Sequence, residues 1–166
     1  MKLQELKRAL DAVDDNDVQK LCSLVNSHDE ILIIGNGGSN AIASHISQDY
    51  TKKLGKKSFT FSDPSRLTCY INDYGMEKAY AQFLKEFSRD DALVILISSS
   101  GNSENILNCA SYCLDTGRKF VILTGFSESN KLKKTYGEHS EVSFWVDSCC
   151  YGVVECAHQS ILHIPA

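Results

Sequence analysis

Hydrophobic and polar positions alternate along the chain in blocks that predict helices and strands. Aliphatic residues recur at every third or fourth position over residues 3–13 and 18–25, which indicates two N-terminal helices joined by a polar turn. Further along, apolar runs bounded by glycine or polar residues predict buried strands. The predicted strands cover residues 30–35, 58–61, 92–97, 120–124 and 141–146.

Each predicted strand leads into a stretch with helical periodicity. These stretches cover residues 40–54, 76–87, 103–116, 130–136 and a closing helix from 151 onward. Strands that alternate with helices form a parallel sheet covered on both faces. The sequence therefore predicts an α/β fold, a three-layer sandwich around a central five-stranded parallel sheet that N-terminal helices precede. A chain of 166 residues without a linker predicts a single domain over residues 1–166.

The charge and composition exclude several classes of partner. A formal net charge of −4 provides no basic field for a nucleic-acid backbone. The apolar runs are far shorter than the roughly 20 residues that cross a bilayer, and the first residues lack the apolar core of a secretion signal. Seven cysteines without CxxC spacing are typical of reduced thiols. We expect a cytoplasmic protein that binds neither membrane nor nucleic acid.

Two loops that follow predicted strands have a composition suited to phosphate. Gly35–Ser39 and Ser98–Ser103 combine glycines, which let the backbone approach a ligand, with serine hydroxyls and the free amides of a helix start. Each loop alone is also compatible with a plain turn, but the pair favours binding of one phosphate monoester. Neither loop matches the nucleotide-binding glycine motifs. The candidate binding residues are Asn36, Gly37, Gly38, Ser39, Ser98, Ser99, Ser100 and Ser103.

Two predicted helices carry side chains that could perform chemistry. His45 and Asp49 are four residues apart and share one helix face, and Glu155 and His163 fall near one stripe of the closing helix. The alternative for His45 and Asp49 is that they lie on a solvent-exposed helix face without a function. His158, between the other two on the closing helix, is expected to be packed rather than to bind a ligand.

The chain resembles the SIS domain proteins and, among them, the sedoheptulose 7-phosphate isomerases, also called phosphoheptose isomerases. The resemblance covers nearly the whole chain and rests on GNGGSNAIASHISQD, LTCYINDYG, ISSSGNSENIL and VVECAHQSILH, in that order. It implies the flavodoxin-like SIS fold, and it implies that Ser39, Ser98, Ser100 and Ser103 grip the phosphate. It also places Asp73 near the sugar hydroxyls.

The resemblance further implies a zinc ion or another divalent metal. Members of the family hold zinc with residues that correspond here to His45, Asp49, Glu155 and His163. Two positions depart from the family, because Asp49 stands in place of glutamate and Glu155 in place of glutamine. The donor types still suit a divalent ion, although the shorter Asp49 changes the reach of its oxygens.

The implied reaction is an aldose-ketose isomerisation through an enediol, which requires a base, an acid and a stabilised oxyanion. Asp49 or Glu155 is the candidate for removing the carbon-bound proton, and His163 for handling the oxygen proton. The family also implies a homotetramer with shared sites, assembled with the help of helices in residues 1–28. The alternatives are another SIS phosphosugar isomerase, for example of arabinose 5-phosphate, and a non-catalytic SIS protein that senses a phosphosugar or binds a partner.

Overall fold

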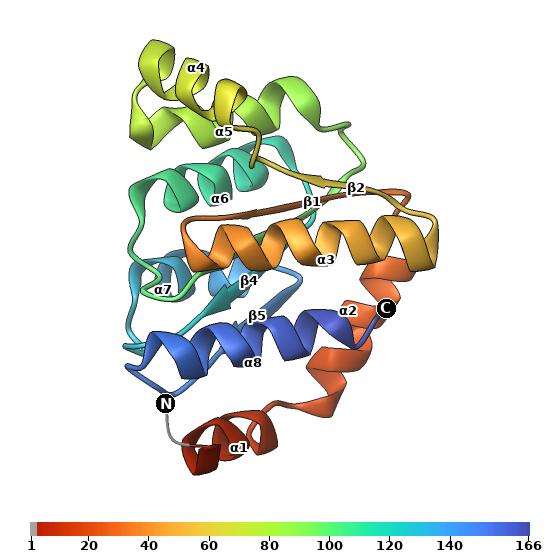
Figure 1. The fold of residues 1–166 in the computed structure, drawn as a ribbon, viewed down its shortest axis with the longest axis vertical. Helices are drawn as coiled ribbons and strands as arrows, with labels where there is room; N and C mark the ends of the chain where they lie inside the picture. Colours follow the sequence, from red (N-terminus) through yellow and green to blue (C-terminus); the bar gives the residue numbers. More distant parts are fainter. Residues whose placement is uncertain (1–2) are drawn as a thin grey trace.

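The computed structural model describes residues 3–166, which form a five-stranded parallel sheet between two layers of helices (Figure 1). The strand order is β2-β1-β3-β4-β5, the flavodoxin-like order of a doubly wound sheet. The predicted α/β sandwich is therefore confirmed. The strands are β1 (Glu30–Gly35), β2 (Lys57–Thr60), β3 (Leu93–Ser98), β4 (Phe120–Thr124) and β5 (Val142–Trp145).

The helices occupy the positions between and around these strands. No helix within residues 3–166 is both long and apolar enough to cross a membrane. The helices are α1 (Leu3–Asp11), α2 (Asp15–Ser27), α3 (Gly38–Leu54), α4 (Pro64–Tyr74), α5 (Met76–Phe87), α6 (Glu104–Thr116), α7 (Lys131–Tyr136), the short 3₁₀ helix η1 (Gly137–His139) and α8 (Tyr151–His163).

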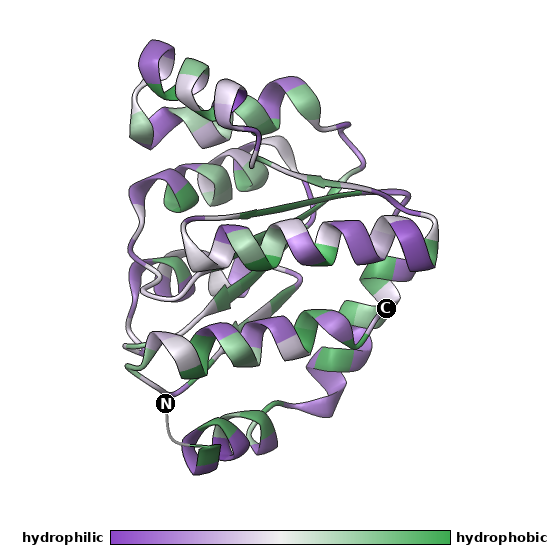
Figure 2. Ribbon diagram, in the orientation of Figure 1, coloured by the Kyte–Doolittle hydropathy of each residue, from purple (hydrophilic) through white to green (hydrophobic). Residues whose placement is uncertain are grey.

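Alternate side chains of the central strands supply two separate apolar layers. Ile31 and Ile33 of β1 pack with α2, α3 and α8, whereas Leu32 and Ile34 pack with α5, α6 and α7. All four are fully buried, which explains why β1 reads as a continuous apolar run. Figure 2 shows these strands as hydrophobic ribbon between helices whose polar residues lie on the outside.

One helix, α4, was not predicted. The signal for its start is present, because Asp63 accepts a hydrogen bond from the Arg66 amide at 2.8 Å and Pro64 occupies the first turn. None of its residues is buried, and its short apolar stripe packs against the core cluster that contains α5. Leu67, Tyr70 and Ile71 have the i, i+3, i+4 spacing of one helix face, so the sequence contains both the periodicity and the capping residues of this helix.

The sheet brings the two predicted binding loops side by side. Gly35 at the end of β1 pairs with Ile97 of β3, so the loops that follow leave the same edge at neighbouring positions. Helices α3 and α8 lie next to each other on one face of the sheet (Figure 1). The buried hydroxyl of Tyr50 donates to the Leu162 carbonyl at 2.9 Å and joins these two helices near their C-terminal ends.

Candidate active site

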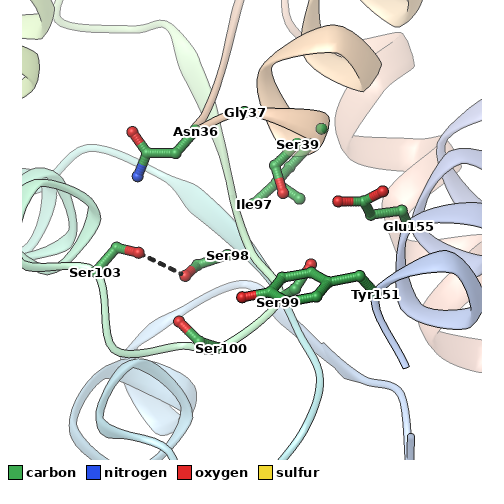
Figure 3. Close-up of a pocket in the computed structure, with 11 residues that line it drawn as sticks. Asn36, Gly37, Ser39, Ile97, Ser98, Ser99, Ser100, Ser103, Tyr151 and Glu155 are labelled. Atoms are coloured by element: carbon green, nitrogen blue, oxygen red, sulfur yellow. Dashed lines mark hydrogen bonds between the residues drawn. The ribbon is translucent and has the colours of Figure 1, made fainter. Parts of the chain in front are cut away.

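A cavity of about 240 Å³ lies where α3, α6 and α8 begin, at the carboxyl ends of β1 and β3 (Figure 3). This is the crevice in which doubly wound folds bind ligands. All eight predicted loop residues line it, and Ile97, Tyr151 and Glu155 complete the wall. The expectation that both loops serve one small pocket is therefore consistent with the geometry.

The serine loop is held in shape by its own backbone. Gly101 has a φ of 61°, and its amide donates to the carbonyl and to the hydroxyl of Ser98, at 3.0 and 3.2 Å. A Cβ at Gly101 would overlap the Asn130 side chain, so the loop requires glycine there. The Ser98 hydroxyl in turn donates to that of Ser103 at 3.5 Å. The hydroxyls are thus gathered on one side of the cavity.

The loop after β1 is fastened to the start of α6 by a pair of amides. Asn36 and the buried Asn105 of α6 exchange two side-chain hydrogen bonds, of 2.9 and 2.8 Å. The side-chain amide of Asn36, which also lines the cavity, thereby positions the loop. Asn105 was not anticipated, because only the fold brings two residues 69 positions apart together.

Glu155 reaches from α8 across the cavity to the first turn of α3. A Cβ at Gly38 would lie within 2.8 Å of the Glu155 carboxylate group, so a side chain there would displace that carboxylate. Within residues 3–166, Glu155 makes no hydrogen bond or ion pair with another side chain, and it is only partly buried. Figure 3 shows the carboxylate facing the cavity beside Ser39.

A second cluster lies further along the same two helices. His45 and Asp49 of α3 meet His163 of α8, with the two imidazole Nε2 atoms 3.1 Å apart. The Asp49 carboxylate lies 3.9 Å from His45 Nε2 and 3.5 Å from His163 Nε2. One donor atom from each residue falls within 4.8 Å of the others, so this triad could hold a metal ion.

Neighbouring groups orient two members of the triad. The Gln159 carbonyl lies 2.8 Å from His163 Nδ1, which assigns the ring proton to Nδ1 and leaves the Nε2 lone pair facing the cluster. Lys53 donates to Asp49 at 3.0 Å, and this hydrogen bond lowers the pKa of the carboxyl despite its burial. Lys53 was not among the predicted site residues, although its i, i+4 spacing from Asp49 was visible.

Two of the predicted residues lie apart from the triad. Glu155 and His163 are eight residues apart on α8, a separation of about 12 Å along a helix, and Glu155 is not part of the cluster formed by His45, Asp49 and His163. Asp73 lies in the last turn of α4, is exposed and does not line the cavity. Its carboxylate instead accepts a contact from the Cys69 thiol at 3.5 Å.

The sequence matches one protein family and several named relatives. The SIS domain family matches residues 4–125. A phosphoheptose isomerase of Fusobacterium nucleatum is 32% identical over 151 residues, covering 88% of this chain and 75% of that protein. One from Helicobacter pylori is 32% identical over 139 residues, covering 78% of this chain and 72% of the relative.

Solved structures show the same fold. The phosphoheptose isomerase GmhA of Neisseria gonorrhoeae superposes with a TM-score of 0.87 at 22% identity, over 96% of this chain and 88% of that one. A phosphoheptose isomerase from Francisella tularensis gives a TM-score of 0.82 at 22% identity, over 98% of this chain and 89% of its own.

Proposed function

The chain belongs to the SIS domain family and, within it, to the phosphoheptose isomerases, and we propose that it interconverts sedoheptulose 7-phosphate and a heptose 7-phosphate. The observation that carries the proposal is the pair α3 and α8. Both helices begin at the serine-lined cavity, and both contribute to the triad of His45, Asp49 and His163. The same two helices thus supply a cavity for the phosphate group and donor atoms that could act on the carbonyl end of the sugar.

In this proposal the phosphate is held by the serine loop. The hydroxyls of Ser98, Ser100 and Ser103 and the N-terminal amides of α6 face one cavity, and the partial positive charge of a helix N-terminus favours an anion there. Ser39 adds a hydroxyl from the first turn of α3. Ser99 has a buried hydroxyl without a partner among the described side chains, which leaves it able to donate to a ligand.

The triad fits a zinc ion. Bonds of about 2.0–2.2 Å from zinc to nitrogen and oxygen place neighbouring ligand atoms of a tetrahedral site about 3.4 Å apart. The three separations between His45, Asp49 and His163 are 3.1, 3.5 and 3.9 Å, which bracket that value. When bound, such an ion would polarise the sugar carbonyl and favour the enediolate.

The proton transfers are assigned to Glu155. The hydrogen bond from Lys53 lowers the pKa of Asp49 and makes that carboxylate a weaker base, whereas Glu155 faces the cavity without a partner. His163 holds its Nδ1 proton on the Gln159 carbonyl, so its Nε2 can either bind a metal or carry a proton. The predicted role of His163 as carrier of the oxygen proton is an alternative to metal binding at the same Nε2 atom, and loss of conversion with a chelator would favour metal binding.

The proposal extends to assembly of the chain. Glu155 and His163 lie about 12 Å apart along α8, a spacing that one phosphosugar can span, so the residues of one subunit or of two could serve one site. As the family resemblance implies, we propose a homotetramer with sites at subunit interfaces, each subunit being a single SIS domain over residues 1–166. The exposed Leu3 and Leu10 of α1 support a role of the N-terminal helices in assembly.

The test is incubation of the purified protein with sedoheptulose 7-phosphate, with and without a chelator, followed by product analysis. We expect conversion that the chelator abolishes and zinc restores. His163→Ala should lose activity, whereas His139→Ala, which changes an exposed histidine of η1, should retain it. Conversion of arabinose 5-phosphate in preference to the heptose would refute the substrate, and absence of any conversion would favour a phosphosugar sensor.

A further inference from the structure

The α8 wall of the cavity contains an aromatic residue to which neither the loops nor the triad assigns a role. Tyr151 is the first residue of α8, and it lines the cavity opposite the serine loop. The residue is 58% exposed. Figure 3 shows the ring lying across the mouth of the cavity with its hydroxyl directed toward the serines.

The ring is supported from behind by a second aromatic residue. Phe126 packs against Tyr151 edge to face, with ring centroids 4.8 Å apart and planes at 72°. Phe126 follows β4 and is the only non-glycine residue with positive φ, at 55°, among residues 3–166. Its amide donates to the Ser148 carbonyl at 3.0 Å. This contact holds the Phe126 ring in place, and the Phe126 ring limits how far Tyr151 can swing.

The Tyr151 hydroxyl has no hydrogen-bond partner among the described residues, although Ser98, Ser100 and Ser103 lie on the wall that it faces. A phenol O–H is a donor that suits an anionic oxygen. A phosphate dianion has three terminal oxygens that accept several hydrogen bonds, and Ser98, Ser100 and Ser103 offer hydroxyls from the loop after β3. The hydroxyl of Tyr151 is a donor on the opposite wall, which the first turn of α8 forms.

We infer that Tyr151 is a substrate-binding residue that covers the phosphate and donates a hydrogen bond to it. The inference rests on the proposed function, from which it takes a phosphosugar as the ligand. It assigns Tyr151 a role in binding that ligand and none in the isomerisation step. The phosphate is far from the bonds that change in an isomerisation, so this hydrogen bond is equally strong in the bound substrate and in the transition state. Its loss should raise KM and leave kcat nearly unchanged.

The test compares Tyr151→Phe with a matched control, Tyr112→Phe, which removes a hydroxyl from α6 outside the cavity. Dissociation constants for sedoheptulose 7-phosphate and for inorganic phosphate are measured by calorimetry, and KM and kcat where turnover is found. A hydrogen bond to a charged group corresponds to a loss of about 10-fold or more in affinity. We expect that loss for both ligands in Tyr151→Phe, and none in Tyr112→Phe.

The calorimetry separates this inference from the proposed function. Tight binding of the phosphosugar by the unaltered protein without isomerisation would refute the function and leave the role of Tyr151 intact. Equal affinities of the unaltered protein and Tyr151→Phe for both ligands would overturn the inference. A fall in kcat with unchanged KM would also overturn it, because it would place Tyr151 in the chemical step.

Discussion

His158 makes the stability of this protein depend on pH in a way that the structure quantifies. The side chain is fully buried on the sheet-facing side of α8, and its Nε2 lies 3.0 Å from the Thr124 carbonyl. This carbonyl assigns the ring proton to Nε2, and the buried Nδ1 has no partner among the described residues. Protonation would therefore place an unpaired charge in the core. Burial lowers the pKa of His158 to about 4, against an ordinary value of 6.5, although the Thr124 contact opposes the change.

The sign and size of the effect follow from these two values. Above pH 6.5 the imidazole is neutral in both the folded and the unfolded chain, so it does not affect the pH dependence of stability. As the pH falls below 6.5 the unfolded chain takes up the proton first, and stability is lost until the folded pKa of about 4 is passed. The full difference amounts to about 3 kcal/mol, of which about 2 kcal/mol is lost by pH 5.

The assay is urea unfolding at fixed protein concentration at pH 7.5, 6 and 5, for the unaltered protein and His158→Gln. Glutamine keeps an N–H that can donate to the Thr124 carbonyl, but it does not titrate. The substitution therefore changes the free energy of unfolding by the same amount at every pH, and this change cancels when the pH dependences are compared. We expect the unaltered protein to lose about 2 kcal/mol more than the variant between pH 7.5 and 5. The exposed His139→Gln should follow the unaltered protein. Parallel curves for the unaltered protein and His158→Gln would refute the reasoning.

Three further predictions concern the site. Glu155→Gln should lower kcat by about 100-fold or more if this carboxylate moves the proton, and turnover close to that of the unaltered enzyme would return that role to Asp49. Gly101→Ala should raise KM, because the new methyl group displaces Asn130. The control is Gly55→Ala, at a position with a similar φ of 68° and open space around it, which should lower stability and leave KM unchanged. Equal KM values for the two variants would contradict this. Glu155→Ala and His163→Ala should each be inactive alone. If two subunits share each site, unfolding and refolding the two variants together should restore about one quarter of full activity, because half of the subunits supply each intact residue. No recovery would place each site within one chain.

Much of the fold could be predicted because the strands are covered on both faces. Residues 31–34 and 93–97 are fully buried, and such strands appear in the sequence as unbroken apolar runs. The helix α4 differs from the strands, because it lies against α5 at the surface and buries no residue, so no unbroken apolar run marks it. A strand end was also misplaced by one residue: β3 continues to Ser98, whose backbone still pairs with Thr124 of β4, and periodicity cannot detect that pairing.

The site could be predicted in part for a similar reason. His45 and Asp49 are close in sequence, and helical spacing alone places them on one face. Contacts such as Asn36 with Asn105, or Phe126 with Tyr151, join segments that only the strand order brings together. The motifs therefore identified the loops, whereas the residues that hold and cover them required the structure.

The separation of Glu155 from the triad is the strongest constraint on how this site can work. A helix fixes residues eight apart at about 12 Å, and no rearrangement of side chains changes that distance while α8 stays intact. Tyr50 fastens α8 to α3 through the Leu162 carbonyl, so a sliding of the two helices would break a buried hydrogen bond. That spacing is comparable with the length of an extended sugar phosphate of about 10 Å, so one sugar could contact both Glu155 and His163, whether the two residues come from one copy of the chain or from two. Recovery of activity in the mixed refolding of Glu155→Ala and His163→Ala distinguishes these two arrangements, because only a site shared between subunits is restored by it.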